Sequence, residues 1–168
     1  MIDFSIGIVD NDKERLDIMG QAIVDVFKVY KFGSGKGLLD NLARQPLELV
    51  LIDFNIPDMN SLQLQQEINK DYPDTHTVMM TAIDRSKCVI ESMKRRAMDY
   101  IYKTEDPERF RSDVCKLVRF LIEEKKRRKA ESALRETGLY NLIKNVYEDR
   151  KVDIDEIKKE IDKIDKRK

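Results

Sequence analysis

The chain has 168 residues, of which 41% are hydrophobic and 38% are charged. This composition supports a packed core and excludes wholesale disorder, and the balance of 32 basic against 32 acidic residues argues against a strongly basic nucleic-acid binder. No apolar run reaches the roughly 18–20 residues that span a bilayer, and the first residues lack the pattern of a secretory signal. Cys88 and Cys115 are the only cysteines, which favours neither a zinc site nor a disulfide scaffold. We therefore expect a cytoplasmic protein.

The two parts of the chain differ in charge. Residues 1–122 hold 17 Lys and Arg against 20 Asp and Glu, a net charge of −3, whereas residues 123–168 hold 15 against 12, a net charge of +3. The second part is rich in Lys, Glu and Asp with sparse Ile and Leu, which is typical of surface helices. We therefore expect a folded domain over residues 1–122, followed by a helical extension over residues 123–168.

Short runs of apolar and β-branched residues recur along the first part and predict five strands. These runs lie at residues 6–9, 29–32, 49–52, 77–80 and 100–102. The segments between them have the spacing of helices, and strands that alternate with helices imply right-handed crossovers and a parallel sheet covered on both faces. The predicted fold class is therefore α/β with a doubly wound sheet, since five such units are too few for an eight-stranded barrel.

Two of the predicted helices can be described in more detail. In the first, hydrophobic residues on one helical face extend as far as Phe27: Leu16, Met19, Ile23, Val26 and Phe27. The fifth helix is expected to continue through residues 123–129 as one rod, because that stretch contains good helix formers without Gly or Pro. Since this stretch has no apolar face, it should be exposed, and two short helices should follow it.

Four polar residues follow the predicted strands at their carboxyl ends. Asp10 follows the first strand, Asp53 the third, Thr81 the fourth and Lys103 the fifth. We expect these side chains to converge, because the carboxyl ends of parallel strands share one edge and ligands bind outside it. Two close carboxylates repel unless a cation joins them, and hard oxygen ligands suit Mg²⁺. A nearby lysine can hold an anionic group opposite the metal, so the set predicts a phosphoryl site.

Four motifs at these strand ends make residues 4–122 resemble the receiver domain of two-component response regulators. They are IVDND at 8–12, LVLIDFNIPDM at 49–59, MMTA at 79–82 and DYIYK at 99–103. The resemblance implies a flavodoxin-like sheet of five parallel strands in the order 2-1-3-4-5. It also implies a phosphoprotein of a two-component system that takes part in signal transduction.

The resemblance further implies a role for each residue of the predicted site. Asp53 would accept a phosphoryl group from a sensor histidine kinase or a phosphotransfer protein, and would bind Mg²⁺ together with Asp10 and the backbone carbonyl of Asn55. Thr81 and the lysine after the fifth strand would contact the phosphoryl oxygens. Tyr100 would occupy the position of the aromatic switch residue. Such a protein is not an enzyme in the usual sense, since it catalyses only its own phosphoryl transfer and loss.

Three positions depart from the family pattern. Two successive acids usually follow the first strand, but here the second is Asn11; the next residue, Asp12, normally caps the following helix. Asn11 or Asp12 is therefore a candidate for a further metal contact, and Mg²⁺ binding is expected to be weak. The usual Lys-Pro pair ends in Thr104, where a cis bond would cost about 2.5–4 kcal/mol, so the loop is either strained or trans. The usual glycines are absent from residues 58–61.

These departures leave three functional hypotheses. The first is a response regulator of a phosphorelay that signals through its helical extension. The second is a receiver-like interaction scaffold not controlled by phosphorylation, motivated by Asn11 and Thr104. The third is a small DNA-binding transcriptional regulator that uses the basic run at residues 125–129. Acidic residues on both sides of that run favour a solvated helix over a nucleic-acid contact.

The end of the chain predicts a protein partner. Isoleucines spaced three, four and three residues apart form a narrow apolar stripe: Ile154, Ile157, Ile161 and Ile164. A short charged helix of this kind is marginal in water on its own. We therefore expect residues 123–168 to pack in a homodimer or against another protein.

Overall fold

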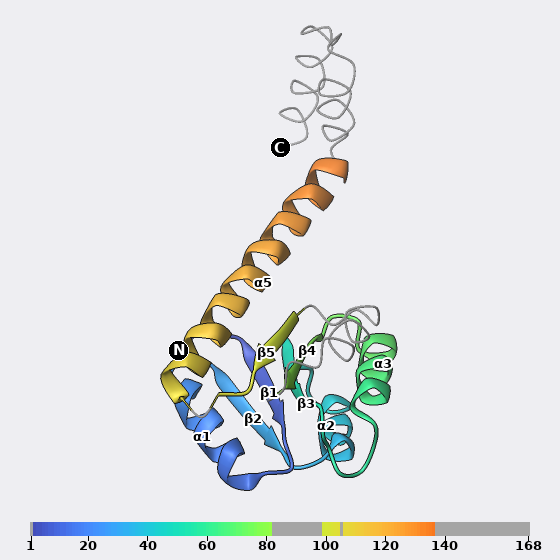
Figure 1. Ribbon diagram of the computed structural model, residues 1–168. Helices are drawn as coiled ribbons and strands as arrows, with labels where there is room; N and C mark the ends of the chain where they lie inside the picture. Colours follow the sequence, from blue (N-terminus) through green and yellow to red (C-terminus); the bar gives the residue numbers. More distant parts are fainter. Residues whose placement is uncertain (1, 82–98, 105, 137–168) are drawn as a thin grey trace, which may run out of the picture. The chain divides into compact units, whose positions relative to one another are not determined.

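The computed structural model describes residues 2–81, 99–104 and 106–136, with the side chains at positions 81, 99, 100, 102 and 136 outside this description. The chain divides into two compact units, Met1–Cys115 and Lys116–Lys168. The first unit contains one sheet of five parallel strands in the order β2-β1-β3-β4-β5 (Figure 1). The strands are β1 Ser5–Val9, β2 Lys28–Phe32, β3 Leu49–Asp53, β4 His76–Thr81 and β5 Asp99–Tyr102. The predicted fold class and strand order are therefore confirmed.

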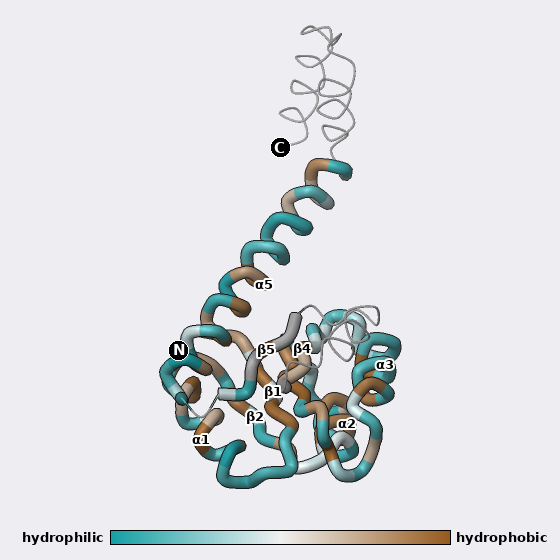
Figure 2. The backbone as a smooth tube through the Cα atoms, in the orientation of Figure 1, coloured by the Kyte–Doolittle hydropathy of each residue, from teal (hydrophilic) through white to brown (hydrophobic). Residues whose placement is uncertain are grey.

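Hydrophobic side chains explain why the central strands form where they do. Every residue of β1 and of β3 is buried, as expected for parallel strands covered on both faces. The edge strand β2 is exposed or half-buried along its length. Figure 2 shows hydrophobic residues along the central strands and mostly hydrophilic residues on the outer helices. The burial pattern thus matches a sheet with helices on both faces.

Four helices are described, and each has a local reason to begin where it does. They are α1 Lys13–Ile23, α2 Gly35–Leu42, α3 Ser61–Asp71 and α5 Pro107–Glu136. Asp12, Ser34 and Asn60 cap the first three, each accepting a hydrogen bond from a backbone N–H of the first turn. Helix α1 lies on one face of the sheet, and α2 and α3 lie on the other (Figure 1). These caps fix the helix starts beside the strand ends.

A hydrophobic cluster joins the sheet to α2 and α3. The buried members come from both helices, from three strands of the sheet and from a residue two positions before β3: Val9, Leu38, Leu42, Leu47, Val50, Ile52, Leu64, Ile68 and Met79. Full burial of an aliphatic side chain of this kind contributes about 1.5–3 kcal/mol. This cluster holds the strands in the register that positions the polar residues at the strand ends.

The first helix is shorter than the sequence predicted. It ends at Ile23 with Val24 as the C-cap, so Val26 and Phe27 do not belong to it. Phe27 is buried all the same, and the next residue already pairs with the sheet, since the Lys28 N–H donates to the Phe4 carbonyl at 3.1 Å. The start of β2 therefore ends a pattern that looked helical in sequence.

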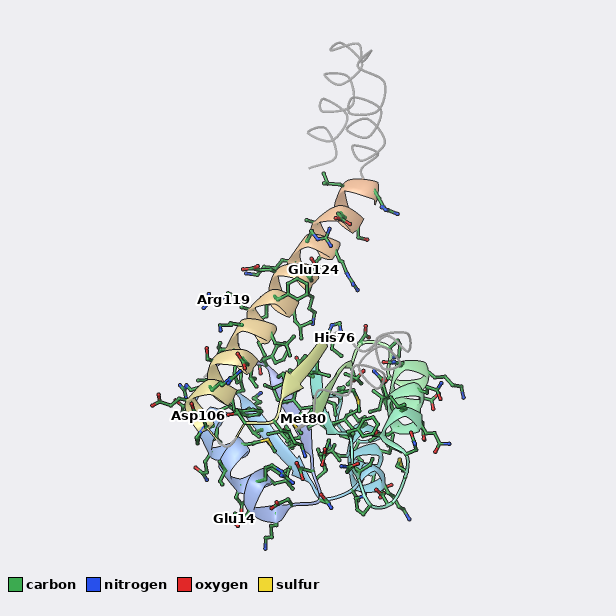
Figure 3. All side chains as sticks on the ribbon, in the orientation of Figure 1. Glu14, His76, Met80, Asp106, Arg119 and Glu124 are labelled. Atoms are coloured by element: carbon green, nitrogen blue, oxygen red, sulfur yellow. The ribbon has the colours of Figure 1, made fainter. Side chains whose placement is uncertain are left out.

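Helix α5 begins with a cap and a proline and extends to Glu136. The Asp106 carboxylate at its N-terminal end accepts hydrogen bonds from the Glu108 and Arg109 N–H groups (Figure 3), and Pro107 suits the first helical position. The prediction that this helix continues through residues 123–129 is confirmed, and these residues are mostly exposed. None of the described helices is both long and apolar enough to cross a membrane. The helix expected between the fourth and fifth strands and the two short helices expected after the fifth helix lie outside the described residues.

Candidate functional site

The register of the sheet places Asp10 and Asp53 next to each other. Val9 of β1 pairs with Ile52 of β3, so the following residue of each strand lies at the same carboxyl edge. Both carboxylates are buried. A buried charge without a partner is strongly destabilising, so two neighbouring buried carboxylates require positive charge close by.

Lys103 supplies one positive charge from the position directly after β5. Its Nζ lies 2.9 Å from Asp10 Oδ2 and 2.6 Å from Asp53 Oδ2, and its side chain is only 8% exposed. One ammonium group therefore bridges the two carboxylates. The structure thus brings together three of the four residues that follow the predicted strands.

Arg15 supplies a second positive charge from the first turn of α1. Its Nε donates to Asp10 Oδ2 at 2.8 Å, and its Nη2 donates to Asp10 Oδ1 at 3.2 Å. The guanidinium therefore binds both oxygens of the carboxylate, a geometry that lysine cannot reproduce. Nη2 also lies 3.3 Å from Asp12 Oδ2. The positive charges of Arg15 and Lys103 thus balance the negative charges of Asp10 and Asp53.

Arg15 is not among the site residues predicted from the sequence. A signal for it exists in the helix itself, because the first turn of a helix favours acidic side chains and disfavours cations. An arginine there, three residues after the cap Asp12 and five after a strand-end acid, is explained by contact with those acids. The neighbouring Glu14 in the same turn is exposed (Figure 3).

The pKa of the Asp10 carboxyl lies below its usual range. Burial alone would raise this pKa, because desolvation penalises the charged form. Hydrogen bonds from Arg15, from Lys103 and from the backbone N–H of Asp12 favour the carboxylate and outweigh the burial. The hydrogen bond to Asp10 is in turn the largest cause of a raised pKa of the Arg15 guanidinium. Asp10 is therefore ionised at neutral pH.

The loop after β3 is attached to the start of α2. Asp58 accepts hydrogen bonds from the N–H groups of Gly35 and Lys36, both at 2.9 Å. A Cβ at Gly35 would lie 2.7 Å from the Met59 sulfur, so the absence of a side chain at position 35 allows this close approach. The loop without its usual glycines is thus ordered by an aspartate.

The remaining predicted site residues differ in how far the structure describes them. Asp12 caps α1 as expected for the family, with its Oδ1 accepting from the Arg15 N–H at 3.1 Å. Asn11 and Asn55 are exposed, the latter in the loop after β3. Thr81 is the last residue of β4, and Tyr100 lies in β5 with its backbone paired to Met79. The side chains of Thr81 and Tyr100 lie outside the described part of the chain, so the roles expected for them stay predictions.

Comparison with known proteins agrees with this arrangement. Residues 6–115 match the model of the response regulator receiver domain. The regulatory protein LuxO of Vibrio cholerae is 28% identical over 87 residues, which cover 52% of this chain and 19% of LuxO. The response regulator protein PilR of Pseudomonas aeruginosa is 32% identical over 116 residues, which cover 67% of this chain and 25% of PilR. The chain thus spans only a minor part of the length of these curated relatives.

Solved structures show the same fold. A CheY-like receiver domain protein from Methanospirillum hungatei has a TM-score of 0.66 at 23% identity, covering 76% of this chain and 99% of that protein. NtrX from Brucella abortus has a TM-score of 0.69 at 20% identity, covering 79% of this chain and 30% of NtrX. The sheet order, the acidic strand ends and the match over residues 6–115 together assign this chain to the receiver domain family of two-component response regulators.

Proposed function

We propose that this protein is a phosphorylation-controlled signalling protein in which Asp53 accepts a phosphoryl group from a histidine kinase or a phosphotransfer protein. The supporting observation is the position of the Asp53 carboxylate, buried at the end of a central strand with Oδ2 at 2.6 Å from Lys103 Nζ. A nucleophile there has a cation beside it before any phosphoryl group arrives. This is the arrangement that phosphoryl transfer requires, because positioning and charge neutralisation dominate its catalysis.

The transfer step can be written in terms of the chain's own residues. A carboxylate oxygen of Asp53 attacks phosphorus, a P–O bond forms, and the bond from phosphorus to the donor atom breaks with its electron pair leaving on the donor. Lys103 Nζ is close enough to contact an oxygen of a phosphoryl group held on Asp53. Thr81, at the end of β4, is proposed to contact a second phosphoryl oxygen. We propose no turnover of any other substrate.

The donor set fits a hard divalent cation such as Mg²⁺. Asp10 and Asp53 offer carboxylate oxygens within reach of one ammonium group, and Asn55 has a backbone carbonyl in the adjoining loop. Among the described residues, no group of three or more His, Cys, Asp or Glu side chains could hold a metal by itself. We therefore propose that the backbone carbonyl of Asn55 joins the two carboxylates as a third ligand. A bound Mg²⁺ would supply positive charge to the phosphoryl oxygens. Asn11 adds no charge, so we propose weak binding.

We further propose a domain boundary near residue 122, with residues 123–168 transmitting the signal to a second copy of the chain or another protein. In the described part of this segment, Arg127 pairs with Glu124 at 2.7 Å and with Glu131 at 3.5 Å. Part of the basic run at residues 125–129 is thus neutralised along its own helix, which argues against nucleic-acid binding. Sedimentation of the full chain against one ending at residue 122 tests this, and identical monomers would exclude the homodimer.

Labelling with acetyl phosphate in the presence of Mg²⁺ tests the main proposal, with intact mass as the measurement. The wild type should be labelled, and Asp53→Asn should not, because the amide keeps the shape of the side chain but is not a nucleophile. Asp40→Asn is the matched control, since Asp40 is an exposed aspartate on α2, and it should be labelled like the wild type. Stoichiometric labelling of Asp53→Asn would refute the assignment, and an unlabelled wild type would favour the interaction scaffold.

A further inference from the structure

Every hydrogen-bonding position of the Asp10 carboxylate is in use. Oδ1 accepts from the Asp12 N–H at 2.9 Å and from Arg15 Nη2 at 3.2 Å. Oδ2 accepts from Arg15 Nε at 2.8 Å and lies 2.9 Å from Lys103 Nζ. A carboxylate has about four acceptor sites, so a cation that binds Asp10 must displace one of these donors.

Arg15 is the donor that can leave at the lowest cost. The Asp12 N–H belongs to the backbone, and the Lys103 side chain is 8% exposed and is also held by Asp53. The Arg15 side chain is 38% exposed, and the helix dipole disfavours a cation in this first turn of α1. A second acceptor is already at hand, since Asp12 Oδ2 lies 3.3 Å from Nη2 and its side chain is 45% exposed.

We propose that Arg15 is an internal competitor of the divalent cation at Asp10. The cation reaches Asp10 only after the guanidinium has left it, and Arg15 then pairs with Asp12 alone. The inference rests on the proposed function for the place where the cation binds, and it adds a residue that sets the affinity. In the absence of a divalent cation, Arg15 and Lys103 balance the two buried carboxylates, so the site is stable without the ion.

Binding of Mn²⁺, measured by the EPR signal of the free ion, tests this competition in the full-length protein. Arg15→Gln should lower the dissociation constant by about tenfold, the size expected when one charge-assisted pair no longer has to be broken. Arg15→Lys keeps the charge but loses the two-pronged contact, so its dissociation constant should lie between those of the wild type and Arg15→Gln. Arg111→Gln is the matched control, because Arg111 makes a similar two-pronged contact with the exposed Asp25, and its Mn²⁺ affinity should be that of the wild type.

A folded Arg15→Gln variant with unchanged or weaker Mn²⁺ affinity would overturn the proposal. Should that variant lack a cooperative unfolding transition, the wild type itself gives the answer through ¹⁵N NMR. The Arg15 Nε–H resonance should shift with added Mg²⁺ and saturate together with metal binding, while the Arg111 Nε–H resonance stays in place. An Arg15 resonance that does not move while Mg²⁺ binds would also overturn the proposal.

These measurements are independent of phosphorylation, since none of them contains a phosphoryl donor. A wild type that shows the competition but is not labelled by acetyl phosphate would refute the proposed function and leave the competition standing. A protein that is labelled on Asp53, but whose Mn²⁺ affinity does not respond to Arg15→Gln, would support the proposed function and refute the competition.

Discussion

The amino and carboxyl ends of the sheet both bury polar groups, but they satisfy them differently. At the amino end, the Ser5 N–H donates to Glu48 Oε2 at 2.8 Å and the Ser5 hydroxyl donates to the same oxygen. The Thr75 hydroxyl donates to the Leu47 carbonyl at 2.8 Å. The donors in these contacts are a backbone N–H and the hydroxyls of short side chains, which have few other positions to adopt.

At the carboxyl end, the buried carboxylates are satisfied by long cationic side chains. Asp10 and Asp53 share Lys103, and Asp10 also holds Arg15, which has a second acid within reach. Long charged side chains can exchange partners, whereas the backbone donors of the amino end cannot. Burial of polar groups alone therefore does not mark a functional site. The carboxyl edge of the sheet is distinguished by buried carboxylates whose partners can exchange.

Removal of Lys103, at the carboxyl end of the sheet, should cause the largest loss of stability. Lys103→Met leaves two neighbouring carboxylates buried without their shared cation, and breaking a buried pair in this way costs about 3–5 kcal/mol of unfolding free energy. Urea unfolding followed by circular dichroism measures this loss. The double variant with Asp53→Asn should recover part of it, because Arg15 still pairs with Asp10 and the carboxylate that lost its cation is then gone. A Lys103→Met protein as stable as the wild type would contradict the electrostatic account of this edge.

Truncation of Glu48, at the amino end of the sheet, should lower the unfolding free energy by less and leave phosphorylation intact. Glu48→Ala removes the acceptor of the Ser5 N–H, and an unsatisfied buried donor costs about 1–3 kcal/mol. Glu48→Gln retains an acceptor oxygen and should lose only a part of that stability. Acetyl phosphate labelling should be unchanged in both variants, and a loss of labelling at matched stability would show that the two ends are not independent.

The carboxyl end should also respond to acid. Because the folded pKa of Asp10 is lowered, its contacts stabilise the fold fully above its unfolded pKa of about 3.9. That stabilisation is lost as the pH falls through the lower folded pKa. The difference in unfolding free energy between the wild type and Asp10→Asn should therefore narrow below about pH 4. If this difference in unfolding free energy stayed constant from neutral pH to strong acid, protonation of Asp10 would not contribute to the loss of stability in acid.

An exposed pair of the same chemistry should show the smallest effect. Arg111 binds Asp25 with two N–H groups at 2.6 and 2.8 Å and also donates to the Ala22 carbonyl at 2.9 Å. Solvent and salt screen such a pair, so Arg111→Gln should lower the melting temperature less than the other variants. Added salt should further reduce the difference in melting temperature between Arg111→Gln and the wild type. If Arg111→Gln lost as much stability as Lys103→Met, burial would not explain why the two ion pairs differ.

Much of this architecture could be predicted from the sequence. The apolar strands and the acids that follow them are local patterns, which explains why the sheet and the positions of Asp10, Asp53 and Lys103 could be placed. Other features depend on contacts that the pattern does not contain. The helical spacing of α1 continues to Phe27, but pairing of β2 with β1 ends the helix at Ile23.

The two unpredicted contacts of the site are non-local or depend on side-chain reach. Asp58 binds backbone groups 22 and 23 residues away, a pairing that no local spacing reveals. Arg15 reaches back over the start of its own helix to Asp10, which requires one particular extension of a flexible side chain. The roles of Thr81 and Tyr100 stay predictions.

The attachment of the loop after β3 to α2 has a consequence for the thermodynamics of binding. Because Asp58 holds this loop on backbone groups of Gly35 and Lys36, and the Phe54 N–H donates to the Met80 carbonyl, the loop that carries the Asn55 carbonyl is already ordered in the folded protein. Its loss of conformational entropy is a cost of folding, at about 1–2 kcal/mol per residue, and not a cost of binding. A ligand at this edge therefore meets a preorganised carbonyl, and the loop can contribute affinity without first having to be immobilised.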